Sequence, residues 1–373
     1  MSEDSKKVTF LPHAQFQNLI DVLHESGYTC IGPQVHDHVI HYDVLTHVDY
    51  LPLGMSEEQE AGSYRLNSLG HNRYFAWANG PQALKPMMFK PREALWQSVK
   101  KEGNGLQFVE QLPEDQLVAV IGARPCDISA LYIQDKHFLQ HECRDPYYLK
   151  HRRDLLVVAI NCTHPAKTCF CVSTGDGPSA NYGYDLLLTE LDDGFVVHVH
   201  TDKGIKIKDK LGLKIASDKQ LSLENEAIQQ AASQQTRHLP SKNLHQVLSE
   251  NLDHPRWDDI ANRCLSCGNC TSVCPTCFCH SEVDEPALDG SHSTHFRQWG
   301  SCFTQKHSYI HGMTIRSDTS LRYRQWFTHK LGTWHEQFGR SGCVGCGRCI
   351  TWCPVGIDIT EEAAIICEGT QHD

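Results

Sequence analysis

One cysteine pattern occurs twice in the second half of this chain. Each run reads C-x2-C-x2-C-x3-C and is followed by proline, a spacing that suits thiolate binding of iron–sulfur clusters. The first run contains Cys264, Cys267, Cys270 and Cys274, and the second contains Cys343, Cys346, Cys349 and Cys353. One such run could be chance or another metal site, but two with identical spacing are a strong signal. The doubled pattern predicts two clusters held close together, and with them electron transfer.

The predicted ligand sets cross between the two runs. Three closely spaced thiolates can bind one cluster, while the fourth cysteine of each run reaches the neighbouring cluster. One cluster is therefore expected to bind Cys264, Cys267, Cys270 and Cys353, and the other Cys343, Cys346, Cys349 and Cys274. Both are expected to be [4Fe–4S], since no ligand position is replaced. The alternative metal is zinc, but four closely spaced thiols per run exceed the two separated pairs of a structural zinc site.

Four further cysteines in the first half of the chain indicate a third centre. Cys126 follows one short apolar run, Cys162 follows a second, and Cys169 and Cys171 come soon afterwards. If the two apolar runs are neighbouring parallel strands, the cysteines at their ends open into the crevice where α/β sheets bind ligands. The alternative is that these thiols are buried as small apolar side chains. Their position beside Gly and Pro turns favours a third [4Fe–4S] cluster.

The remaining cysteines are less informative. Cys277 and Cys279 continue the first run, and Cys302 follows a Trp-Gly-Ser segment. They could bind metal together with Cys274 or His280, or they could pack around the first cluster. Structural roles are expected for the three isolated cysteines, Cys30, Cys143 and Cys367.

Length and composition limit the class of protein. The chain has 373 residues, enough for two domains, and its net charge of -11 argues against binding to nucleic acid or to an anionic membrane. A mean hydropathy of -0.42 and short apolar runs predict no membrane span. The first residues contain no apolar segment typical of a signal peptide, so a cytoplasmic protein is expected. In a reducing compartment, 18 cysteines indicate metal binding rather than disulfides.

Apolar periodicity predicts the elements that must position the cysteines in the first half of the chain. Residues 117–122 and 155–160 are predicted to be strands buried on both faces, with a helix at 127–141 between them. A further helix is predicted at about 92–101. This strand–helix–strand order suggests that residues 1–245 form a mixed α/β domain.

The second part of the chain has a different character. Residues 246–373 hold both cysteine runs, separated by a spacer much longer than that of a compact ferredoxin. The spacer contains a long predicted helix at about 321–338. We therefore expect an α+β protein in which the α/β domain is followed by a mainly helical, ferredoxin-like domain that binds two clusters.

Several segments of the chain resemble one known family. They include Gly-Ala-Arg-Pro-Cys-Asp-Ile at 122–128, Cys-Phe-Cys at 169–171, Gly-Tyr-Asp-Leu at 183–186 and Cys-Val-Gly-Cys-Gly-Arg-Cys at 343–349. These segments resemble the beta subunit of cytosolic sulfhydrogenase-type nickel–iron hydrogenases, and equally its relative, the iron–sulfur subunit of anaerobic sulfite reductase. From about residue 85 onward, the resemblance covers nearly the whole chain.

The resemblance implies a role that the cysteines alone do not. In such complexes this subunit conducts electrons between a flavin subunit that binds NAD(P)H and a catalytic redox subunit. That partner is either a nickel–iron hydrogenase, which we favour, or a sirohaem sulfite reductase. The chain itself is then expected to have no catalytic residues.

Interpretations from other classes are weaker. A DNA-binding iron–sulfur sensor would need a basic recognition helix, which the acidic composition disfavours. A heterodisulfide reductase would favour an adjacent Cys-Cys pair, and the sequence has none. A zinc scaffold would yield colourless protein.

Overall fold

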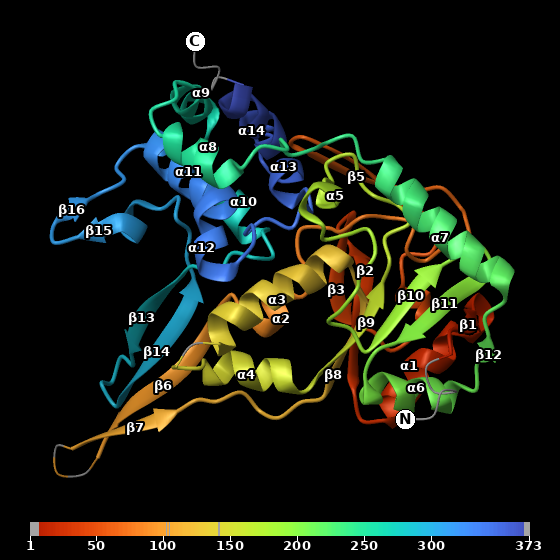
Figure 1. Ribbon diagram of the computed structural model, residues 1–373. Helices are drawn as coiled ribbons and strands as arrows, with labels where there is room; N and C mark the ends of the chain where they lie inside the picture. Colours follow the sequence, from red (N-terminus) through yellow and green to blue (C-terminus); the bar gives the residue numbers. More distant parts are fainter. Residues whose placement is uncertain (1–6, 102, 104, 141, 369–373) are drawn as a thin grey trace.

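The computed structural model describes residues 7–101, 103, 105–140 and 142–368 (Figure 1). An eight-stranded sheet forms the first part of the chain. Its strands are β1 (Thr9–Pro12), β2 (Thr29–His36), β3 (Val39–Val44), β8 (Val118–Ala123), β9 (Leu155–Ile160), β10 (Leu186–Glu190), β11 (Gly194–Val199) and β12 (Lys214–Ile215). They follow the order β12-β1-β11-β10-β9-β8-β2-β3. The central strands β10, β9, β8 and β2 are parallel, and the outer pairs are antiparallel.

Helices cover both faces of this sheet. On β9, Leu156 and Val158 join an apolar core with α1 (Phe16–Glu25) and α6 (Asp202–Leu211). The alternate residues of β9 pack instead with α3 (Pro125–Leu139) and α4 (Pro146–Arg153). The long helix α7 (Asp218–Ser233) lies alongside the sheet (Figure 1). The two predicted strands buried on both faces, and the helix between them, are therefore confirmed.

A second sheet joins segments from both parts of the chain. It has four antiparallel strands in the order β13-β14-β6-β7, formed by β6 (Arg92–Lys100), β7 (Leu106–Glu110), β13 (His280–Pro286) and β14 (His292–Trp299). In Figure 1 it reaches out to the lower left. The helix predicted at 92–101 is wrong, because β14 and β7 pair with both edges of this segment. A domain boundary near residue 245 stays a prediction.

The cysteine runs lie among short helices in the last part of the chain. These are α8 (Leu244–Glu250), α9 (Arg256–Arg263), α10 (Asn269–Ser272), α11 (Thr319–Thr328), a π-helix (His329–Thr333), α12 (Trp334–Phe338), α13 (Arg348–Thr351) and α14 (Ile359–Glu368). From α11 to α12 the chain is continuously helical, so the predicted long helix is confirmed, with a π-helical turn inside it. Aromatic side chains such as Trp257 and Phe327 fill the core between these helices.

Several smaller elements complete the described structure. They are two hairpins, β4–β5 (Met55–Glu60 and Ser63–Ser68) and β15–β16 (Tyr309–Ile310 and Met313–Thr314), the short helices α2 (Lys85–Met88) and α5 (Cys171–Thr174), and 3-10 turns at His13–Gln15, Val48–Tyr50 and Gln305–Ser308. Within the part of the chain that the structure describes, no helix has the length and apolar character needed to cross a bilayer.

A buried ionic network fastens the four-stranded sheet to the helices of the large sheet. Arg297 on β14 pairs with Glu93 on β6 at 2.9 Å and with Asp145, which caps α4 by accepting from the Tyr148 amide. Glu93 also contacts the His151 ring at 2.8 Å. Burial alone would raise the pKa of Glu93, but its bonds to His151 and Arg297 outweigh that effect and hold the pKa below its ordinary value.

We expect Arg297→Met to destabilise the protein by roughly 3–5 kcal/mol, because it leaves the buried Glu93 with only His151 as a partner and removes the cation paired with Asp145. The control is Arg92→Met, since the Arg92–Glu285 pair is about half exposed and contributes roughly 0–1 kcal/mol. Because the pKa of Glu93 is depressed, Glu93 stabilises the folded protein above its unfolded-state pKa. This contribution to the free energy of unfolding is lost as the pH falls through the folded-state pKa. Urea unfolding midpoints measured against pH test this, and equal losses in the two variants would contradict it.

Candidate metal centres

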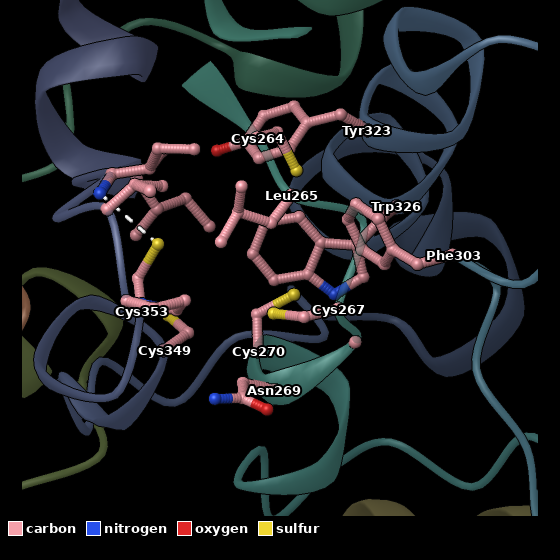
Figure 2. A pocket seen from close by; sticks show the side chains of 15 residues that line it. Cys264, Leu265, Cys267, Asn269, Cys270, Phe303, Tyr323, Trp326, Cys349 and Cys353 are labelled. Atoms are coloured by element: carbon pink, nitrogen blue, oxygen red, sulfur yellow. Dashed lines mark hydrogen bonds between the residues drawn. The ribbon is translucent and has the colours of Figure 1, made fainter.

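Three cysteines of the first run and two of the second run line a single cavity. Cys264 ends α9, Cys267 and Cys270 lie in the turn and helix that follow, and Cys353 comes just after α13. All four line the same cavity, and Figure 2 shows their side chains around it. The structure thus brings together the four cysteines that were expected to share a cluster, including the one from the distant run.

The walls of this cavity are apolar, and one edge is open. The side chains that line it include Leu265, Phe303, Tyr323, Trp326, Val355 and Ile357. Cys267 and Leu265 are exposed, with Leu265 63% accessible. A group bound here would be shielded from water on most sides and would approach the protein surface at this edge.

Backbone amides point at sulfur atoms of the cavity. The Ser266 amide donates to Cys264 Sγ at 3.4 Å, and the Ile357 amide donates to Cys353 Sγ at 3.3 Å. Ser266 and Gly268 both have positive φ, which curls the chain around the site. Such N–H···S bonds stabilise negative charge on thiolate ligands.

The second set comprises Cys343 and Cys274, which are buried, and Cys346 and Cys349, which are partly buried. Burial raises the pKa of the Cys349 thiol well above its ordinary value, and Cys343, Cys346 and Cys274 raise it further. Burial likewise raises the pKa of Cys343 to about 12. A metal must therefore displace these protons when the thiols bind it. These thiols lie close enough to influence one another, and Cys270 of the first run acts on Cys349 as well, so the grouping of this second set stays a prediction.

The cysteines of the N-terminal part line a cavity of their own. Cys126 lies in the first turn of α3, Cys162 follows β9, and Cys169 and Cys171 precede and begin α5. All four line one cavity, as expected for residues at the ends of neighbouring parallel strands. Burial raises the pKa of the Cys171 thiol to about 12. A set of four soft sulfur donors, one buried and three partly buried, fits iron–sulfur chemistry.

Polar side chains complete the N-terminal cavity. Gln235, just beyond α7, donates to Cys171 Sγ at 3.2 Å, and Asn79 lies 3.9 Å from Cys126 Sγ. Asn79 also donates to Asp127, which pairs with Arg348 at 2.8 Å. Sequence analysis missed Asn79 and Gln235, because an isolated amide residue carries no local signal and only the fold brings it to the sulfur atoms.

The three cysteine groups are contiguous. Cys349, predicted as a ligand of the second cluster, also lines the cavity of the first. Cys346, from the same run, also lines the N-terminal cavity. The second run therefore lies between the other two groups and touches both.

Glycines permit this contact between the second run and the N-terminal cysteines. Gly345 has a φ of +63°, and a Cβ there would lie 2.5 Å from the backbone of Cys171. At Gly347 a Cβ would lie 2.4 Å from the Thr168 carbonyl oxygen. The Phe170 amide donates to the Gly345 carbonyl at 2.8 Å. Only glycine allows this close approach of two backbones.

The remaining cysteines have different surroundings. The base of the β13–β14 hairpin holds Cys279 near Cys302, since the Gly300 amide donates to the Cys279 carbonyl at 2.8 Å. Cys277 is hydrogen-bonded to Cys274. Metal binding and packing both remain open for this group. Of the three isolated cysteines, Cys30 and Cys367 are buried and Cys143 is exposed.

In the described residues, no three or more His, Cys, Asp or Glu side chains form a group that could hold a metal ion. A single zinc ion needs all its ligands around one point. In an iron–sulfur cluster each thiolate binds a different iron, so its ligands stand apart around the cluster.

We expect Gly345→Ala to lower stability by roughly 2–5 kcal/mol, from left-handed strain plus overpacking against Cys171, and to lower the iron content. The control is Gly339→Ala, since Gly339 has a similar φ of +71° but nothing lies within 4 Å of the place that a Cβ would occupy. That variant should lose only about 1–2 kcal/mol. Urea unfolding and iron analysis measure both effects, and equal behaviour of the two variants would refute the packing argument.

Comparison with known proteins agrees with this geometry. Residues 263–357, which span both cysteine runs, match a family described as a 4Fe-4S dicluster domain. Over 288 residues the chain is 30% identical to sulfhydrogenase 2 subunit beta of Pyrococcus furiosus, covering 76% of this chain and 83% of that protein. No solved structure matches the chain. The identity and coverage show that this chain belongs to the family of sulfhydrogenase beta subunits.

Proposed function

We propose that this chain is a noncatalytic, cytoplasmic electron-transfer subunit of a multi-subunit oxidoreductase. It relays electrons between a flavin-containing subunit that binds NAD(P)H and a catalytic partner, a nickel–iron hydrogenase. The observation that carries the proposal is the contiguity of the three cysteine groups, in which Cys349 and Cys346 each line a neighbouring cavity. An isolated structural metal site would not need such an arrangement, whereas electron transfer needs centres held close together.

The proposed ligands follow the cysteine groups. Two [4Fe–4S] clusters would bind the crossed sets of the two runs, and a third would bind Cys126, Cys162, Cys169 and Cys171. When bound, each cluster supplies reversible one-electron oxidation and reduction. The protein itself contributes spacing, burial and electrostatics.

The residues around the first cavity suit exchange of electrons with a partner. Phe303, Tyr323 and Trp326 exclude water from the inner side, while Leu265 and Cys267 lie exposed at the edge. A partner docked over that edge would come closest to the first site. We propose this edge as one of the two places where electrons enter or leave the protein.

The hydrogenase assignment is favoured over sulfite reduction by the relative itself, which is named a sulfhydrogenase subunit. Purification of the native complex under anaerobic conditions tests the choice. We expect a flavoprotein and a nickel-containing protein to co-purify with this chain, with nickel found by metal analysis. A sirohaem protein in place of the nickel protein would select sulfite reductase, and a colourless chain with stoichiometric zinc would reject the electron-transfer proposal.

Iron counting tests the third centre. The purified full chain should hold about twelve iron atoms if three [4Fe–4S] clusters are bound, and Cys126→Ser with Cys162→Ser should hold about eight. Cys30→Ser and Cys143→Ser serve as controls, one buried and one exposed, and should leave the iron content unchanged. Unchanged iron in the Cys126/Cys162 double variant would reject the N-terminal cluster.

A further inference from the structure

Lys330 lies close to Cys274 and Cys343, two cysteines of the second set. It lies in the π-helical turn between α11 and α12 and is only 4% exposed. Its Nζ donates to Thr276 Oγ1 at 2.7 Å and to the Gly342 carbonyl at 3.4 Å. Thr276 Oγ1 lies 3.2 Å from Cys274 Sγ, and Gly342 immediately precedes Cys343. The ammonium group therefore stands between the remote cysteine and the first cysteine of the second run.

The backbone fixes Lys330 in this place. The Gly342 amide donates to the Lys330 carbonyl at 2.8 Å, so Gly342 is bound by both the backbone and the side chain of the lysine. The Trp334 ring covers the ammonium, with its centroid 4.6 Å from Nζ. Thr276 donates in turn to the Gly342 carbonyl at 2.7 Å. The charge cannot swing away to solvent without breaking these contacts.

The counter-charge of Lys330 has to come from the cysteines. In the part of the chain that the structure describes, Lys330 makes no ion pair with a carboxylate within 4.0 Å. A buried ammonium without a negative partner is costly. Cys274, Cys277 and Cys343 are the cysteines that lie close to the ammonium group. The cysteine sulfurs are the acidic groups that face this charge.

A second buried lysine reinforces this local positive charge. Lys85, 6% exposed, donates to the carbonyls of Thr271 and Ser272 and lies 3.9 Å from the centroid of the Trp299 ring. In the described structure it too makes no ion pair with a carboxylate. Two buried lysines without a carboxylate partner lie beside one cysteine segment, an arrangement that suits an anionic group there.

We propose that Lys330 is a positioning residue that sets the reduction potential of the cluster bound by Cys343, Cys346, Cys349 and Cys274. The inference rests on the proposed function, since it needs that cluster. A fixed positive charge stabilises the reduced state, which carries one more negative charge, and so raises the potential. Because Lys330 reaches Thr276 and Gly342, its effect falls on the second cluster more than on the first.

The test is a redox titration of the full chain, followed by electron paramagnetic resonance, with iron content measured in parallel. Lys330→Gln removes the charge but keeps a donor for Thr276 and Gly342. At a fixed potential we expect the reduced-to-oxidised ratio of one cluster to fall at least tenfold, a shift of about 59 mV for one electron, with the other clusters unchanged. Lys330→Arg keeps the charge and should retain the native potential. Lys306→Gln removes an exposed charge and is the control.

The outcomes separate this inference from the proposed function. Native iron content with unchanged midpoints in Lys330→Gln would overturn the inference and leave the proposed function standing. Equal shifts of all clusters would also overturn it, since they would indicate a general structural change. If Lys330→Gln loses iron, Lys330→Met provides the second charge-free variant. Loss of iron in both charge-free variants, together with native iron and native potentials in Lys330→Arg, would show that the cluster requires a positive charge at position 330. Absence of iron–sulfur signals from the native chain would overturn both proposals.

Discussion

The close packing of the second cysteine run against the 168–171 segment is the contact on which the rest of the site depends. At Gly345 and Gly347 the two backbones approach too closely for any side chain. The contact brings Cys346 to the N-terminal cavity and leaves Cys349 at the cavity of the first run. The large sheet and the helical part are thereby joined through the cysteine groups themselves. A separate two-cluster carrier tethered by a linker would have no need of this shared backbone contact.

Charge compensation is the second constraint on this interior. Arg348 and Asp127 are both 1% exposed and pair beside Cys126 and Cys346, which keeps that part of the site close to neutral. Near Cys274 the arrangement differs, because Lys330 has no carboxylate partner among the described residues. Neighbouring cysteine groups therefore experience different electrostatic fields, although all of them consist of the same type of side chain. Differences in field of this kind are how a protein gives chemically alike clusters different potentials.

The sequence predicted the elements whose signal is local. The apolar runs at 117–122 and 155–160 are strands, and the long helix at 321–338 is present with a π-helical turn. The helix predicted at 92–101 was wrong, because the pairing of β6 with β14 is decided by residues almost 200 positions away. For the same reason the cysteine spacing indicated which thiols could share a site, while the amides of Asn79 and Gln235 could be found only in the fold.

The overall charge of this chain is negative, yet several buried cations lie near its cysteine groups. The sequence carries a net charge of -11, which excluded nucleic acid and anionic membranes as expected partners. Of the buried cations near the cysteine groups, Arg348 pairs with Asp127, whereas Lys85, Arg124 and Lys330 make no ion pair with a carboxylate among the described residues. Buried cations are expensive unless an anion compensates them. The proposed thiolate-bound clusters would be anionic, so they would supply the negative charge that these buried cations lack.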